Sequence, residues 1–187
     1  MKTWPVPHSF SMKLPEKDAP GAFWKNRIDR HHCGVDIYAP VSSEVLAVEC
    51  GEVIDCGIFT SPDSVPYWNT TYFVVVKHPG GMVGKYAEME RIQVETGDII
   101  DRGQIIGYVG EVLDPVKITS ESPLYIQRLK QSGHRSMLHF ELYRGTHTII
   151  NEYSGGNIFN GSMPDNLLDP TAYLNQSAEA GKFSSSN

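Results

Sequence analysis

The chain has 187 residues, with 22 acidic and 16 basic side chains and a formal net charge of -6 at pH 7. This length fits one domain with short additions. Such a domain can bury roughly two thirds of its unfolded surface and fold without disulfides or a structural metal ion. The acidic balance provides no basic surface for nucleic acid or for an anionic membrane, so we expect neither partner. No segment approaches the roughly 18 apolar residues of a membrane span.

Residues 1–30 are rich in proline, aromatic residues and charge and lack periodicity, which predicts an irregular N-terminal arm packed on the domain. Prolines and charges also interrupt residues 1–21, where a secretory signal needs an unbroken apolar core. The three cysteines, Cys33, Cys50 and Cys56, are odd in number and lack CxxC spacing, so we expect reduced thiols. These features predict a cytoplasmic protein, with a secreted form supplied without its leader as the alternative.

From Gly34 onward most segments are short, rich in Val, Ile, Tyr or Phe, and bounded by Gly, Pro or Asp, as is typical of strands. The expected strand regions are residues 34–40, 43–57, 72–81, 82–90, 98–110 and 137–145. They predict an all-β domain over residues 31–175, mainly antiparallel and sandwich- or barrel-like. Residues 122–133, SPLYIQRLKQSG, are the exception and predict a short helix or a loop over the sheet.

The C-terminal region begins with a long Gly- and Asn-rich segment, residues 151–166, which we expect to be a mobile loop or a wall of an active site. Residues 167–174, LLDPTAYL, close the domain. The composition of the last residues predicts a disordered tail over 176–187.

The segment HRSMLHFELYRG contains a histidine, His139, in the middle of an alternating run. One face of the expected strand carries Leu138, Phe140 and Leu142, and the other carries Met137, His139, Glu141 and Tyr143. His139 therefore points away from the apolar face. A lone histidine in such a place is usually a hydrogen-bonded strand residue, unless partners elsewhere in the chain give it another role.

His32 and Asp36 in RHHCGVDIYAP are candidate partners. In a straight strand they would lie roughly 13 Å apart, too far to share a metal ion. A glycine between them, Gly34, can take backbone angles that bend the chain and bring imidazole and carboxylate together. Nitrogen and oxygen ligands suit zinc, which commonly takes three protein ligands at a catalytic site and leaves one position for water. His139 would be the third ligand, and the alternative is a histidine merely hydrogen-bonded to a nearby aspartate.

These segments resemble the lysostaphin/LytM-type zinc endopeptidases, which cut peptide bonds of bacterial cell-wall peptidoglycan. The resemblance runs from His32 to Leu174 through HCGVDIYAPVSSEVLAVECGEVI, VVVKHPGGMVGKYAEM, VETGDIIDRGQIIGYVG, LHFEL and LLDPTAYL. It implies that His32, Asp36 and His139 hold one zinc ion per chain. It also implies an antiparallel β groove of the duplicated hybrid type, with the metal on its floor and variable loops as walls.

The chain departs from the family pattern at two positions. The family usually carries a histidine in a Y-x-H segment and another as the first histidine of H-L-H, where this chain has Glu88 and Met137. A thioether has no proton to give and is a weak acceptor, so Met137 can only line the groove. Glu88 is a possible general base beside a zinc-bound water, although its charge would repel a developing oxyanion. Alternatively, Glu88 is a solvated strand residue without a catalytic role.

Four further residues are candidates for the site or its surroundings. Tyr86, two residues before Glu88, is expected to share its face and line the groove. His134 follows a glycine and could swing in as a substitute proton shuttle. His31 could replace His32 as ligand, although adjacent residues of an extended chain point apart. His78 matches a histidine at a strand end in the family and is expected to be structural.

The sequence leaves two functions open. One is an atypical zinc hydrolase that acts on a peptide of the peptidoglycan type with Glu88 as base. The other is a zinc-binding protein without catalysis that binds a peptide, glycan or protein partner in the same groove, where metal binding contributes to folding. A third interpretation, a lipoyl, biotinyl or phosphocarrier domain suggested by the G-D-x-x-x-x-G-Q segment, is disfavoured because a carrier lysine motif is missing and the histidine motifs fit poorly.

Overall fold

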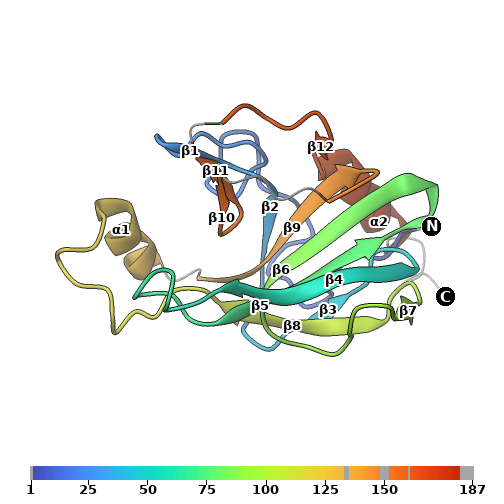
Figure 1. Cartoon of the computed structure of the whole chain (residues 1–187), viewed down its shortest axis with the longest axis horizontal. Helices are drawn as coiled ribbons and strands as arrows, with labels where there is room; N and C mark the ends of the chain where they lie inside the picture. The colour runs from blue at the N-terminus through green and yellow to red at the C-terminus, as the bar shows by residue number, and fades with distance from the viewer. Residues whose placement is uncertain (1, 133–134, 148–151, 160, 182–187) are drawn as a thin grey trace.

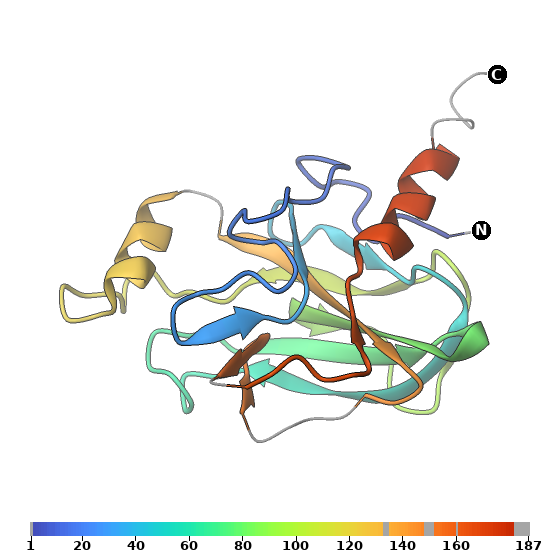
Figure 2. The same ribbon diagram turned by 90° about the horizontal axis from the view of Figure 1, so that it is seen from above.

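The computed structural model describes residues 2–132, 135–147, 152–159 and 161–181. Its strands form a nine-stranded sheet and a three-stranded sheet, and every described strand pair is antiparallel. In Figures 1 and 2 the small sheet lies over one side of the large one, α1 projects from one end, and α2 lies toward the other end near the N-terminus. The expected fold class, mainly antiparallel all-β with few short helices, is confirmed.

The described elements have the following bounds. The large sheet contains β2 (Val35–Tyr38), β3 (Glu44–Leu46), β4 (Gly51–Thr60), β5 (Thr71–Lys77), β6 (Met82–Ile92), β7 (Ile99–Ile100), β8 (Ile105–Glu111), β9 (Ser136–Arg144) and β12 (Leu167–Leu168). The small sheet contains β1 (Arg30–His32), β10 (Tyr153–Ser154) and β11 (Asn157–Phe159). The helices are α1 (Leu124–Ser132) and α2 (Thr171–Gly181), with a short 3₁₀ turn, η1 (Pro79–Gly81).

Strand β9 is central because it pairs with β2, β6, β8 and β12. Its apolar side chains, Leu138, Phe140 and Leu142, are buried in the main core, as the alternation predicted. The opposite face is also buried, since His139 is only 1% exposed. The strand is therefore covered on both sides, and its polar face lies toward the small sheet rather than toward solvent.

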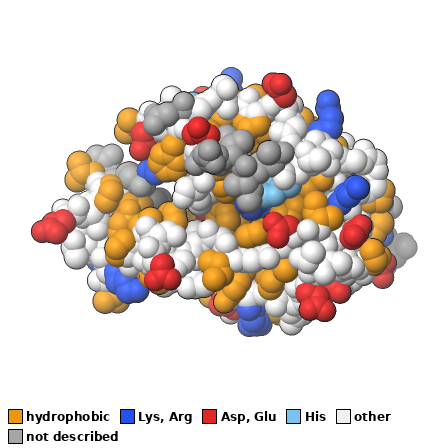
Figure 3. Space-filling view, in the orientation of Figure 1, with side chains coloured by type: hydrophobic (Ala, Val, Ile, Leu, Met, Phe, Trp, Pro, Cys, Tyr) orange, Lys and Arg blue, Asp and Glu red, His pale blue; other side chains and the backbone are white. Residues whose placement is uncertain are grey.

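The N-terminal arm packs on the domain. Trp4 and Val6 belong to the main core, and Leu46 donates a backbone hydrogen bond to Pro5 at 2.8 Å. On the face drawn in Figure 3 the described basic side chains appear singly rather than as a continuous patch. No helix in the described part of the chain has the length and apolar composition of a membrane span.

The C-terminal region differs from expectation at two places. Residues expected to form a mobile loop or wall contain the β10–β11 hairpin, whose β11 pairs with β1. Gly155 and Gly156 take positive φ angles of 52° and 74° between Ser154 and Asn157, as a tight hairpin turn requires. These strands are too short to show periodicity, so only the Gly-Gly pair could have revealed them.

Helix α2 extends through Gly181, so residues 176–181 are helical rather than a tail. The side-chain oxygen of Asp169 accepts the backbone N–H of Thr171 at 2.8 Å and caps the first turn. Tyr173 and Leu174 anchor that turn in the core. Residues 182–187 lie outside the described part of the chain.

Candidate metal centre

Two neighbouring strands and the end of a third bring the predicted ligands together. Asp36 in β2 lies directly opposite His139 in β9, and His32 is the last residue of β1 in the small sheet. Gly34 lies between the two sheets at a bend of the chain, as predicted, and close packing also requires a glycine there. A Cβ on this glycine would lie 2.3 Å from the carbonyl oxygen of Phe140, so a side chain there would push β2 away from β9.

The three candidate ligands converge on one point. Asp36 Oδ1 lies 3.0 Å from His32 Nε2 and 3.0 Å from His139 Nδ1, and the two ring nitrogens are 3.0 Å apart. All three side chains are buried. Among the described residues, these three alone form a group whose ligand atoms all lie within 4.8 Å of one another. Two imidazole nitrogens and a carboxylate oxygen form a donor set that fits zinc and leaves a fourth position for water.

The remaining ring nitrogens of both histidines are occupied by protein groups. His32 Nδ1 lies 2.9 Å from the carbonyl oxygen of Ala22, to which it can donate. His139 Nε2 lies 2.9 Å from Glu141 Oε1. These partners leave His32 Nε2 and His139 Nδ1 free to face the centre, and such outer partners orient metal-binding histidines.

The N-terminal arm also holds the carboxylate ligand. Arg27 Nη2 lies 3.5 Å from Asp36 Oδ2, the oxygen that points away from the histidines. The same guanidinium donates to Pro20 O at 2.8 Å and to Asn157 Oδ1 at 3.0 Å. Arg27 therefore joins the arm, the β10–β11 hairpin and the metal centre, and it leaves Asp36 Oδ1 available as a ligand.

The electrostatics of the cluster favour an ionised carboxylate. Burial opposes ionisation of Asp36, but the two histidines hold the pKa of its carboxyl far below the usual range. Burial lowers the pKa of His32. Burial alone would also lower the pKa of His139, but its hydrogen bonds to Asp36 and Glu141 outweigh this and raise the pKa to about 9. A bound cation would replace protons in this cluster, which is how metal affinity becomes dependent on pH.

Glu88 lies beside the ligands rather than among them. Its backbone φ of 67° is unusual for a residue other than glycine and marks local strain. Its Oε2 atom is buried and has no hydrogen-bond partner. Burial raises the pKa of Glu88 to about 8, and the Asp36 carboxylate adds to this shift while His139 and Arg27 oppose it. With this pKa the carboxyl holds its proton at neutral pH, and its unpartnered oxygen fits a group that awaits a cation or another ligand beside it.

Tyr86 lies in the core rather than in a groove, which corrects the expectation that it shares a face with Glu88. It is fully buried, and its hydroxyl accepts the Val48 N–H at 2.9 Å. Its ring meets Phe140 edge-on with centroids 5.0 Å apart. The positive φ at Glu88 interrupts the alternation of β6, so a spacing of two residues no longer means a shared face.

The other sequence candidates are placed as follows. Met137 is half-buried in β9 and lies opposite Tyr38 of β2. This residue pair is two pairs along the strands from the pair Asp36–His139. His31 stacks on Trp24 with ring centroids 4.6 Å apart, outside the ligand group. His78 is buried, with Nδ1 3.0 Å from the carbonyl oxygen of Cys50. His134 lies outside the described residues.

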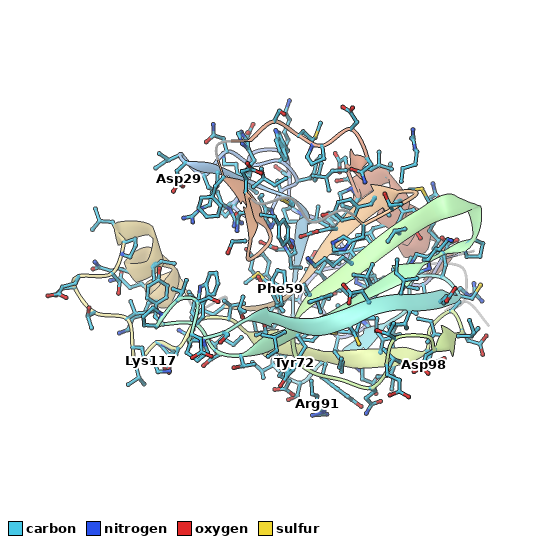
Figure 4. The ribbon with its side chains drawn as sticks, in the orientation of Figure 1. Asp29, Phe59, Tyr72, Arg91, Asp98 and Lys117 are labelled. Atoms are coloured by element: carbon cyan, nitrogen blue, oxygen red, sulfur yellow. The ribbon has the colours of Figure 1, made fainter. Side chains whose placement is uncertain are left out.

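Several groups around the centre were not found from the sequence. The ring of Phe59 in β4 stacks on His139 with centroids 5.9 Å apart, and Figure 4 shows Phe59 on the side of the large sheet that faces the small one. Arg27, Tyr153 and Asn157 come from segments without a recognisable pattern. Glu141 is the exception, because it follows His139 by two residues on the same strand face and could have been proposed as its partner.

Replacing Gly34 with alanine is expected to lower the free energy of unfolding by about 3 kcal/mol, because the new methyl group would meet a backbone carbonyl that cannot rotate away. Gly57→Ala is a matched control in β4, since its Cβ would make only an ordinary contact, 3.4 Å from Phe73 Cε1. Urea unfolding of both variants measures the difference. Equal stability of the two variants would contradict the close-packing role of Gly34.

Comparisons with known proteins find a matching family and similar solved structures. The model of peptidase family M23 matches residues 30–151. A sequence comparison with curated proteins finds no match. The fold is similar to that of the antimicrobial peptidase lysostaphin from Staphylococcus simulans, with a TM-score of 0.54 and 18% identity over 92% of this chain and 56% of that chain. This chain therefore spans little more than half of that protein.

Two further solved structures have the same fold. LytU matches with a TM-score of 0.52 and 19% identity, covering 89% of this chain and 88% of that one. A chain of the complex of SpoIIIAH and SpoIIQ matches with a TM-score of 0.51 and 19% identity, covering 92% of this chain and 99% of that one. Identities this low establish the similarity of fold alone.

Proposed function

The chain belongs to peptidase family M23, and from this premise we propose that it is an atypical zinc hydrolase that cuts a peptide amide bond of the peptidoglycan type. The observation that supports this most is the convergence of Asp36 Oδ1 with one nitrogen of each histidine, His32 and His139, at 3.0 Å. Protein partners hold the other polar atom of each ligand. Such a prepared set of three ligands is what a catalytic zinc site requires.

A zinc ion in this site would lower the pKa of a bound water toward neutrality and polarise the substrate carbonyl. A cation beside Glu88 would lower its raised pKa and so ionise it. The carboxylate would then take the proton from the attacking water and pass it to the leaving amine, since its buried Oε2 has no hydrogen-bond partner. Arg27, whose side chain is one third exposed beside Asp36, would offset the repulsion between Glu88 and a developing oxyanion.

Glu88→Gln should reduce hydrolysis at least 100-fold while zinc binding stays unchanged, because the amide cannot accept the proton and Glu88 lies outside the ligand group. Release of new amino termini from oligoglycine and from purified peptidoglycan, followed by mass spectrometry, measures the loss. Glu90→Gln is the matched control on the same strand, since the Glu90 carboxylate bonds to Ser42 instead. Unchanged hydrolysis by the Glu88 variant would refute its role as base.

A second function is favoured by one feature of the sequence: Met137, in β9, stands where the family usually carries the first histidine of H-L-H. In this alternative the protein keeps zinc to hold the site together and binds a peptide, glycan or protein partner without cutting it. Zinc-loaded protein that retains peptidoglycan fragments on a column and releases no new amino termini would support this alternative over hydrolysis.

A further inference from the structure

Lys85 is a buried lysine that the proposed hydrolysis does not use. It lies in β6 directly opposite Glu141 of β9 and is 2% exposed. Its Nζ donates to the hydroxyl of Tyr153 at 2.7 Å. The ammonium also lies 4.2 Å from the ring centroid of Tyr153, 5.0 Å from that of Phe73 and 5.1 Å from that of Phe59. Burying a charge is costly unless it is paired, so this placement calls for an explanation.

The partner of this charge is Glu141, which is fully buried. Its Oε1 accepts from Tyr153 at 2.6 Å and lies 2.9 Å from His139 Nε2, and its Oε2 accepts from Tyr143 at 2.5 Å. The Tyr153 hydroxyl thus accepts from Lys85 and donates to Glu141, which links the two charges through one group. Removing only one charge would leave the other unpaired in the interior.

The same network fixes the hairpin against the metal centre. Tyr153 belongs to β10, and Gly156 follows in the turn, where an added Cβ would lie 2.7 Å from His139 Nε2. Cys33, next to His32, donates a backbone hydrogen bond to Gly156 O at 2.9 Å. A shift of the hairpin would therefore displace the ring of His139 and the end of β1 together.

We infer that Lys85 is a positioning residue of the metal centre: by compensating Glu141 and sharing Tyr153 with it, Lys85 holds His139 with Nδ1 directed at the metal position. Its effect reaches the metal only through Glu141 and the hairpin, without contact with substrate. The inference rests on the metal site of the proposed function and is independent of whether the protein hydrolyses anything.

A double-mutant cycle with zinc affinity as its readout tests this inference. Lys85→Met and Glu141→Gln should each weaken zinc binding about tenfold, in the range seen for outer partners of metal ligands. Zinc binding by the double variant should be no more than about twofold weaker than that of Glu141→Gln alone, because the effects of substitutions at contacting residues in one network are not additive. Competition with a chromophoric chelator gives the affinities. Lys77→Met, at an exposed position of β5, is the matched control and should leave them unchanged.

Two results would overturn the inference: an unchanged zinc affinity for Lys85→Met, or losses that add in the double variant. If Lys85→Met does not fold, Tyr153→Phe decides the question, since it removes only the hydroxyl shared by Lys85 and Glu141. We expect it to weaken zinc binding about threefold, and an unchanged affinity would overturn the inference. A natural protein that binds no zinc would instead refute the proposed metal site, on which this inference rests.

Discussion

Asp36→Ala is expected to abolish zinc uptake by the folded protein, whereas the natural chain should bind about one zinc ion. The substitution removes the oxygen that lies 3.0 Å from both histidine nitrogens, and two ligands do not make a stable zinc site. Removing a residue that hydrogen-bonds to a metal ligand typically weakens metal affinity 10- to 100-fold. Removing a ligand itself should therefore weaken zinc affinity on the order of 1000-fold or more. The variant also leaves Arg27 without its carboxylate partner.

Elemental analysis after native purification and chelator competition after metal titration measure this effect. His139→Ala should give the same loss, and Asp101→Ala, at an exposed position, should bind zinc like the natural chain. Zinc should also raise the melting temperature of the natural chain but not that of Asp36→Ala, because only a ligand that binds the native state stabilises it. Full zinc occupancy in Asp36→Ala would refute the assignment of the ligands.

The joint replacement of Glu88 and Met137 by histidine should raise peptidase activity at least 100-fold above that of the natural chain, because a positioned acid–base group typically contributes 10²- to 10⁴-fold. Met137 lies two residues before His139 on the same strand, and histidine is similar to methionine in size. The backbone at Glu88 already holds its side chain near Asp36 and His139. Imidazoles at both positions could transfer a proton and stabilise an oxyanion.

Matched variants make the result interpretable. Met137→His alone and Glu88→His alone show whether both positions are needed, and Asp36→Ala added to the double variant should remove the gained activity. A double variant that binds zinc and still cuts neither oligoglycine nor peptidoglycan would mean that the site no longer accepts these peptides in a reactive position. That result would favour the binding protein over the hydrolase.

Local pattern predicted most strands of the large sheet and the His/Asp/His cluster, but it missed β12 and joined β3 with β4 and β7 with β8 in single regions. Alternation over residues 137–143 places His139 opposite the apolar face, and the buried Leu138, Phe140 and Leu142 confirm this. His32, Asp36 and His139 come from two short motifs, and the structure brings them together. Such patterns are readable because side-chain direction in a regular strand depends only on spacing along the chain.

Irregular backbone is where prediction from spacing failed. Tyr86 was expected beside Glu88, but the positive φ of Glu88 interrupts the strand and leaves Tyr86 in the core. The β10–β11 hairpin has strands too short for periodicity, and α2 continues past the residue where composition suggested a tail. For Tyr86 and for the hairpin, the tertiary contacts rather than local preference determine the conformation.

The sequence alone therefore determined the fold class, the resemblance to a zinc peptidase family and the three candidate ligands, because each depends on residue types at short, regular spacings. Only the tertiary structure placed Arg27 on Asp36 and joined Lys85, Tyr153 and Glu141 behind His139. Lys85 and Tyr153 are 68 positions apart in the sequence, and the Asp36 that Arg27 holds is 103 positions from His139. Except for the contact between Glu141 and His139, no pattern along the chain encodes these contacts. They arise when the arm, two sheets and a hairpin pack around buried charges that must be paired.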